Sequence, residues 1–238
     1  MRMNLAQGAK VRRMREIGSH FWLDIPVLDF VGEDVDLFSL GQDRVYVLSG
    51  RTALDFVLDD LSAEIHAVYM PSYCCSSMLQ PFLERGVQID FYDVFLGPEG
   101  LQYSIDYEKR VDIFYATSYF GFESTSMDDS IRAFKNRNVT VIEDITHRLL
   151  CSKPCCEDSD YLIASLRKWF PIPCGGLAVK TNGNFATGRL LDPPSGLVEK
   201  RITAMRLKAE YICGSSSGIH GLEKKEYLSL FAGFEQEL

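Results

Sequence analysis

Lys168 is the residue whose position in the sequence points most directly to covalent chemistry. Lys168 ends the segment Ala164–Lys168, which continues the apolar stretch that begins at Tyr161. Trp169 and Phe170 follow the lysine. A lysine among apolar neighbours loses proton affinity and becomes an amine nucleophile that can form a Schiff base with a carbonyl group. Ser165, three residues earlier, could hold an anion beside it. The alternative interpretation is a surface lysine next to an aromatic pair.

Two carboxylates at the end of a second apolar segment form the next candidate group. Glu143 and Asp144 follow Val141 and Ile142, and His147 comes three residues after Asp144. Ligands of open parallel sheets bind beyond the carboxyl ends of the strands, so an acid at such an end is a candidate site residue. Asp144 is the stronger candidate of the two acids. His147 returns to the same face if the chain turns helically, and a structural role for it is an equally good interpretation.

A third group lies where a predicted strand passes into a predicted helix, at Ser49-Gly50-Arg51-Thr52. Gly50 allows the backbone to approach a ligand closely. The free N–H groups of the first helical turn, the Thr52 hydroxyl and the positive end of the helix together form an anion site of phosphate size. An ordinary helix cap is the alternative.

Strands and helices alternate in the part of the chain that must position these groups. This alternation predicts an α/β fold with a mostly parallel sheet flanked by helices on both faces. We expect strands at 45–48, 67–70, 87–91, 111–116 and 139–142, and helices at 52–61, at 76–85 with a cap at Gly86, and from a cap at Ser126 through 134.

The pattern changes beyond residue 160. Strands are expected at 161–165 and 175–180, and we expect a sheet edge or an antiparallel strand in this region. Apolar spacing of three and four predicts a long amphipathic helix from Leu197 to Ile212, with Ser195 as a candidate cap. A flexible connection at 213–218 and a last helix at 223–234 complete the pattern.

Composition excludes several classes of partner. The 238 residues carry 25 Lys and Arg against 33 Asp and Glu, a net charge of -8. Such a chain is not expected to bind nucleic acid. The apolar runs are shorter than the roughly 20 residues that a membrane helix needs, so no membrane partner is expected. The basic residues that precede Glu16 suit a basic surface arm or a transit peptide, and we favour the arm.

The seven cysteines indicate a reducing compartment. Cys74 and Cys75 are adjacent in sequence, as are Cys155 and Cys156. This spacing suits neither a disulfide framework nor a zinc ribbon, so we expect a cytoplasmic protein without a bound metal. The cysteines at 151, 155 and 156 are interpreted as ordinary loop or buried thiols.

Taken in order, these segments resemble the DegT-like sugar aminotransferases, a family of fold-type-I enzymes that use pyridoxal 5'-phosphate (PLP). The resemblance covers roughly residues 45 to 180, and the order and spacing of short motifs carry it. These motifs are Ser49–Leu54, which resembles the phosphate-binding turn, Tyr69–Cys75, Leu83–Asp93, Tyr119–Gly121, Val141–Asp144, and Asp160–Lys168 with Gly175 and Gly176.

The resemblance implies a role for each candidate residue. Lys168 would form the Schiff base with PLP and then move a proton between substrate and cofactor carbons. Asp144 would pair with the pyridinium nitrogen. His147 would contact the phenolic oxygen of the ring. The phosphate would be bound by Gly50, Arg51, Thr52 and Ser165, and Cys75 falls where the family places an aromatic side chain against the ring.

The family's activity implies transfer of an amino group, with glutamate as donor, to a keto-sugar attached to a nucleotide, by a homodimer. Residues 1–44 would be an N-terminal arm, 45–190 the PLP-binding large domain, and 191–238 the helical start of a small C-terminal domain, most of which the chain would lack. Two alternatives stay open. One is a non-catalytic binding module with the same fold, and the other is a cysteine desulfurase-like enzyme using Cys151, Cys155 or Cys156.

Overall fold

The computed structural model describes residues 20–23, 40–61, 64–98, 100–121, 125–188, 192–213 and 220–238. The chain divides into two compact units. The larger comprises residues 29–169 and 174–192, and the smaller comprises 1–28, 170–173 and 193–238. Most of the predicted N-terminal arm lies outside the described residues, and the predicted domain boundaries stay predictions.

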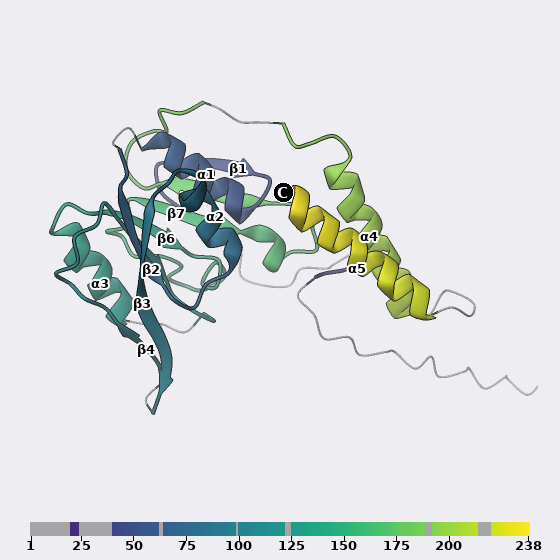
Figure 1. Cartoon of the computed structure of the whole chain (residues 1–238), viewed down its shortest axis with the longest axis horizontal. Coiled ribbons are helices and arrows are strands. Elements are labelled where there is room, and N and C mark those ends of the chain that lie inside the picture. Colours follow the sequence, from purple (N-terminus) through teal and green to yellow (C-terminus); the bar gives the residue numbers. More distant parts are fainter. Residues whose placement is uncertain are drawn as a thin grey trace, which may run out of the picture. The chain divides into compact units, whose positions relative to one another are not determined.

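An eight-stranded sheet forms the centre of the larger unit (Figure 1). Its strands lie in the order β1-β8-β7-β6-β5-β2-β3-β4. β3, β2, β5, β6 and β7 are parallel, β8 is antiparallel to both of its neighbours, and β4 is antiparallel to β3. The α/β class, the mostly parallel sheet and an antiparallel strand beyond residue 160, which is β8, are therefore confirmed. The strands are β1 (Asp43–Val47), β2 (Ala67–Pro71), β3 (Gln88–Gly97), β4 (Gly100–Ser104), β5 (Ile113–Thr117), β6 (Thr140–Asp144), β7 (Tyr161–Ser165) and β8 (Gly176–Lys180).

Helices cover both faces of this sheet (Figure 1). Helices α1 (Gly50–Asp60) and α2 (Ser76–Glu84) lie on one face, and α3 (Thr125–Lys135) lies on the other. Successive strand residues point to opposite faces. Phe114 of β5 therefore stacks on Phe134 of α3 with ring centroids 4.2 Å apart, while the next residue, Tyr115, meets Phe82 of α2. The sheet is thus buried on both sides where its parallel strands run.

Three local predictions differ from the structure. β3 continues to Gly97 and pairs with β4, a strand that the sequence pattern did not predict. The side chains of β4 stay partly exposed and show no alternation of buried and exposed positions. Ser126 lies inside α3 rather than at its cap. The N–H of Lys200 donates to the carbonyl of Gly196, so the first helical hydrogen bond of α4 (Leu197–Cys213) starts after Ser195.

The smaller unit contains α4 and α5 (His220–Glu237), which pack side by side (Figure 1). Met205, Tyr227 and Phe231 form the centre of this pair. Arg201, 2% exposed, lies over the ring of Phe231. Both predicted helices are confirmed, while residues 214–219 of the predicted connection lie outside the described part. Within the described residues, none of the helices has the length and apolar character that crossing a membrane requires.

The turn that leads into α1 is pressed against the start of β8. The Ser49 hydroxyl caps the helix by accepting the Thr52 N–H at 3.1 Å. The Gly175 N–H donates to the carbonyl of Leu48 at 2.8 Å. A Cβ added at Gly176 would lie 2.0 Å from the Ser49 carbonyl oxygen, closer than any real contact. Only glycine fits at 176 without moving the Ser49 turn.

We therefore expect Gly176→Ala to lower the free energy of unfolding by about 2 kcal/mol, because the backbone of the turn must shift. Urea denaturation measures this change. Gly188→Ala is the matched control, since a Cβ at Gly188 would meet nothing within 4 Å. Equal unfolding midpoints for the two variants would contradict the close contact.

Candidate functional site

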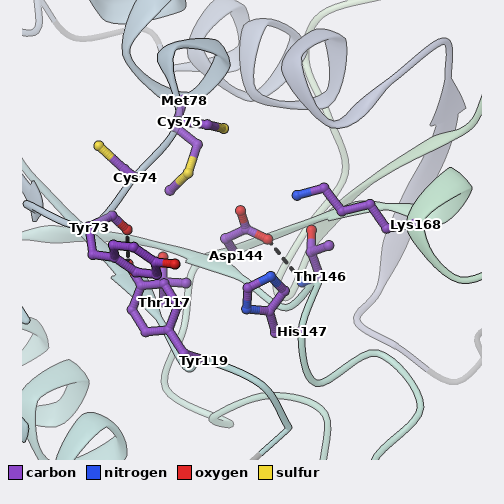
Figure 2. A pocket seen from close by; sticks show the side chains of 10 residues that line it. All are labelled: Tyr73, Cys74, Cys75, Met78, Thr117, Tyr119, Asp144, Thr146, His147 and Lys168. Atoms are coloured by element: carbon purple, nitrogen blue, oxygen red, sulfur yellow. Dashed lines mark hydrogen bonds between the residues drawn. The ribbon is translucent and has the colours of Figure 1, made fainter. Parts of the chain in front are cut away.

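A cavity of about 270 Å³ opens at the carboxyl ends of β2, β5 and β6 (Figure 2). This is where ligands bind in open sheets of this kind. Among the residues predicted from the sequence, Asp144, His147, Lys168 and Cys75 line it together. The complete lining is Tyr73, Cys74, Cys75, Met78, Thr117, Tyr119, Asp144, Thr146, His147 and Lys168.

Two donors fix the Asp144 carboxylate at the end of β6. The Thr146 N–H donates to Oδ1 at 2.9 Å, and the Tyr115 hydroxyl donates to Oδ2 at 3.2 Å. Tyr115 is fully buried, and burial raises its pKa well above the ordinary value, with a further contribution from Asp144. The phenol therefore keeps its proton and acts as a donor. Asp144 is held in one orientation at the cavity wall.

His147 is held as a neutral ring with a defined proton position. The N–H of Phe120 donates to Nδ1 at 3.3 Å, so in the neutral ring the proton is on Nε2. The Phe120 ring stacks on the imidazole with centroids 5.4 Å apart. Burial lowers the pKa of His147, Asp144 opposes this effect, and Lys168 adds to it. His147 can therefore donate one hydrogen bond from Nε2.

Lys168 ends a short 3-10 turn, Leu166–Lys168, that directly follows β7. Its side chain extends toward Asp144 in the cavity (Figure 2). β6 and β7 are neighbouring parallel strands, and both ends open on the same edge of the sheet. The amine and the carboxylate that the sequence singled out therefore reach one cavity.

The four residues predicted to bind phosphate form a neighbouring cluster and do not line the cavity. A Cβ at Gly50 would lie 3.1 Å from the Cβ of Ser165, so the turn before α1 and the end of β7 touch. The Thr52 hydroxyl lies 3.0 Å from Ser49 Oγ, which makes it part of the helix cap. Nε of Arg51 is buried and has no hydrogen-bond partner among the described residues. In this cluster the backbone at Gly50 can come close to a bound anion, and Nε of Arg51 can donate a hydrogen bond to it.

Cys74 and Cys75 line the cavity, whereas Cys151, Cys155 and Cys156 lie in a loop outside it. Cys75 is exposed on the cavity wall, with its sulfur 2.9 Å from Ser77 Oγ. Burial raises the pKa of Cys155 to about 12 and also raises that of Cys156. Cys151 donates to the carbonyl of Gly121. The loop cysteines do not line the cavity, and none of the described residues form a group of three or more His, Cys, Asp or Glu able to hold a metal ion.

Glu143, the neighbour of Asp144, points into the opposite face of the sheet. Its side chain is fully buried, and Oε2 accepts the Ser159 hydroxyl at 2.7 Å and the Cys156 N–H at 2.9 Å. Arg148 lies 3.7 Å from Oε1. Burial raises the pKa of Glu143 to about 7, although these three partners oppose it. Glu143 is therefore part of the core and not of the cavity.

The raised pKa of Glu143 predicts a pH dependence of stability. Between about 4.5 and about 7 the folded protein keeps a proton that the unfolded chain has released, so raising the pH favours unfolding. The effect of this one group amounts to at most about 3 kcal/mol over that range. Urea unfolding at several pH values should show a steeper fall for the wild type than for Glu143→Gln. Parallel curves for the two proteins would contradict the assigned pKa.

Sequence reasoning missed several residues of the cavity. Thr117 ends β5, and Tyr73 follows β2, so both occupy strand ends equivalent to that of Asp144. Tyr119 donates its hydroxyl to the carbonyl of Tyr73, and burial raises its pKa. Thr146 lies between Asp144 and His147. Listing every polar residue at a predicted strand end would have found most of them.

No family model matches the chain, and no curated protein matches it. Solved structures are similar to part of it. The 3-amino-5-hydroxybenzoic acid (AHBA) synthase aligns with a TM-score of 0.47 and 18% identity, over 59% of this chain and 38% of that one. DesI, crystallised with its TDP-sugar product, aligns with a TM-score of 0.48 and 15% identity, over 60% and 38%. SPT with PLP aligns with a TM-score of 0.44 and 11% identity, over 58% and 38%.

These likenesses concern the fold of part of the chain. One of the three structures, that of SPT, was solved with PLP. The alignments cover 38% of each of these three structures, so the chain spans well under half their length.

Proposed function

We propose that this chain binds PLP at the cavity and acts as an aminotransferase, moving an amino group from glutamate to a keto-sugar attached to a nucleotide. One observation carries the proposal: Lys168 and Asp144 line a single cavity of about 270 Å³ at the carboxyl ends of the parallel strands. A nucleophilic amine and a fixed carboxylate are the two groups that a pyridine aldehyde needs from a protein.

The residues present fit the cofactor's phosphate as well as its ring. Arg51 brings a buried, unpartnered Nε to the N-terminal turn of α1, where the helix favours negative charge. Gly50 leaves room that a side chain would fill, since its own Cβ would already press on Ser165. The N–H groups of Gly50 and Arg51 precede the first helical hydrogen bond, in which the Ala53 N–H donates to the Ser49 carbonyl. Phosphate would satisfy these donors.

When bound, PLP supplies an electron-accepting ring that stabilises negative charge on the substrate carbon next to the amine. Asp144, oriented by Tyr115 and Thr146, would face the ring nitrogen and favour its protonated form. His147 would offer its Nε2 proton to the phenolic oxygen. Lys168 would hold the group through Nζ and would be the base that moves a proton at the substrate carbon.

The finer parts of the proposal rest on the sequence resemblance to the sugar aminotransferases. These are glutamate as donor, the nucleotide-linked keto-sugar as acceptor, a homodimeric assembly and a cytoplasmic location.

Covalent trapping tests the proposal. The protein is incubated with PLP, reduced with borohydride, digested and analysed by peptide mass spectrometry. We expect a pyridoxyl group on Lys168 at close to one per chain. Equal labelling of several surface lysines, or no labelling at 168, would overturn the proposal. Incubation of the loaded protein with glutamate should then convert the cofactor to its amine form, which absorbance follows.

Cys75 favours a second candidate, a desulfurase-like enzyme, because its exposed thiol lines the same cavity as Lys168. The structure moves this hypothesis from the loop cysteines to Cys75. Release of alanine from free cysteine, with sulfide released when dithiothreitol reduces the persulfide formed on the enzyme, would favour it over amino transfer if Cys75→Ser abolishes both.

A further inference from the structure

We propose that Thr146 is a positioning residue that holds Lys168 at a set place relative to Asp144. This inference rests on the proposed function, because it concerns how the cavity presents its amine and its carboxylate to one ring. Thr146 is 4% exposed and lies two residues beyond the end of β6.

Thr146 uses each of its polar groups to join these two segments. Its N–H donates to Oδ1 of Asp144 at 2.9 Å. Its hydroxyl oxygen accepts the N–H of Ser165 at 2.9 Å, just before the turn that carries Lys168. Its carbonyl accepts the indole N–H of Trp169, just after that turn. Lys168 therefore lies between two anchor points on the same residue that orients Asp144.

Of these three contacts, only the one made by the hydroxyl depends on the side chain at 146, because the other two use its backbone N–H and carbonyl. The turn Leu166–Lys168 has only three residues, and Ser165 provides no side-chain cap for it. Its entry is held by the hydroxyl of Thr146, which accepts the Ser165 N–H, and by the Leu166 N–H, which donates to the carbonyl of Gly175 at 3.0 Å. Because the Ser165 N–H is buried, removing that hydroxyl leaves a buried donor without an acceptor, and the turn must shift to reach another. A shift of this segment moves Nζ of Lys168 away from the carbon it must bind.

The test compares Thr146→Val, which keeps the shape and loses the hydroxyl, with Thr146→Ser, which keeps the hydroxyl. The readout is the rate at which PLP becomes reducibly attached to Lys168, measured by borohydride trapping and corrected for the folded fraction by circular dichroism. We expect Thr146→Val to slow attachment at least about tenfold. Thr146→Ser should stay within about twofold of the wild type, because its hydroxyl still accepts the Ser165 N–H.

Two further variants separate positioning from stability. Thr181→Val is the matched control. The hydroxyl of Thr181 also bonds to the backbone, at the carbonyls of Ser159 and Asp160, but Thr181 does not line the cavity. This variant should attach PLP at the wild-type rate even if it unfolds more readily. Trp169→Phe removes the second anchor and should slow attachment in the same direction. Wild-type attachment in Thr146→Val, or equal slowing in Thr181→Val, would overturn the proposal.

Hydrogen exchange in the cofactor-free protein keeps the two proposals distinguishable. If the wild type takes up no PLP, the proposed function fails, and exchange in residues 165–169 still reports on the anchor. Faster exchange there in Thr146→Val than in Thr181→Val would support Thr146 as the residue that holds the turn. Unchanged exchange would overturn it.

Discussion

Lys168→Arg is expected to abolish the reducible attachment of PLP and to lower the rate of amino transfer by at least about a thousandfold. Arginine keeps the positive charge and much of the length, so the cavity stays polar and filled. Its guanidinium stays protonated in proteins, however, and can neither add to an aldehyde nor move a proton at neutral pH. Borohydride trapping with peptide mass spectrometry measures attachment, and a coupled glutamate assay measures transfer.

The control for this substitution is Lys109→Arg. Lys109 forms an ion pair with Asp90 and does not line the cavity, so its replacement should change neither readout. Attachment that survived in Lys168→Arg, with the pyridoxyl group on another lysine, would place the reactive amine elsewhere and end the assignment of Lys168.

Asp144→Asn has the second largest expected effect. The amide keeps the shape of the carboxylate and loses its negative charge, so the ring nitrogen no longer holds its proton and the ring accepts electrons less well. We expect PLP still to attach to Lys168 while amino transfer falls by a factor of about 100 or more. Single-turnover absorbance with glutamate would measure the step that slows.

Glu143→Gln is the matched control for Asp144→Asn, because it makes the same chemical change one residue away on the opposite face of the sheet. It should change the pH dependence of stability and leave single-turnover rates near those of the wild type. Similar losses in both variants would mean that charge near the end of β6, and not contact with the ring, governs the rate.

Glu143 and Asp144 show how much of the candidate site a local sequence pattern can predict. Both acids end the same apolar segment, and the general location of ligand sites in open sheets suggested that one of them faces a ligand. Because successive strand residues point to opposite faces, only one of them can do so. In the structure Asp144 lines the cavity, and Glu143 is enclosed by Ser159, Cys156 and Arg148.

The β3–β4 ribbon, in contrast, is a part of the fold that the local sequence pattern did not predict. The period-two reading of Val87, Ile89 and Phe91 ended the predicted strand at 91, whereas in the structure Phe91 is exposed and Tyr92 is buried. The strand continues because its backbone pairs with residues 100–104, and pairing of this kind depends on main-chain hydrogen bonds that any residue but proline can make.

By itself the sequence determined which segments alternate as strands and helices, and it put a lysine, an aspartate and a glycine turn at the ends of three strands. Periodicity and turn chemistry are local properties, so they can be read without a structure. The tertiary structure alone decided that Tyr115 and Thr146 hold Asp144, that Thr146 also anchors the Lys168 turn, and that Thr52 belongs to a cap. The Tyr115–Asp144 bond spans 29 positions and the Thr146–Ser165 bond 19. Contacts over such separations depend on how strands pair, which no local pattern records.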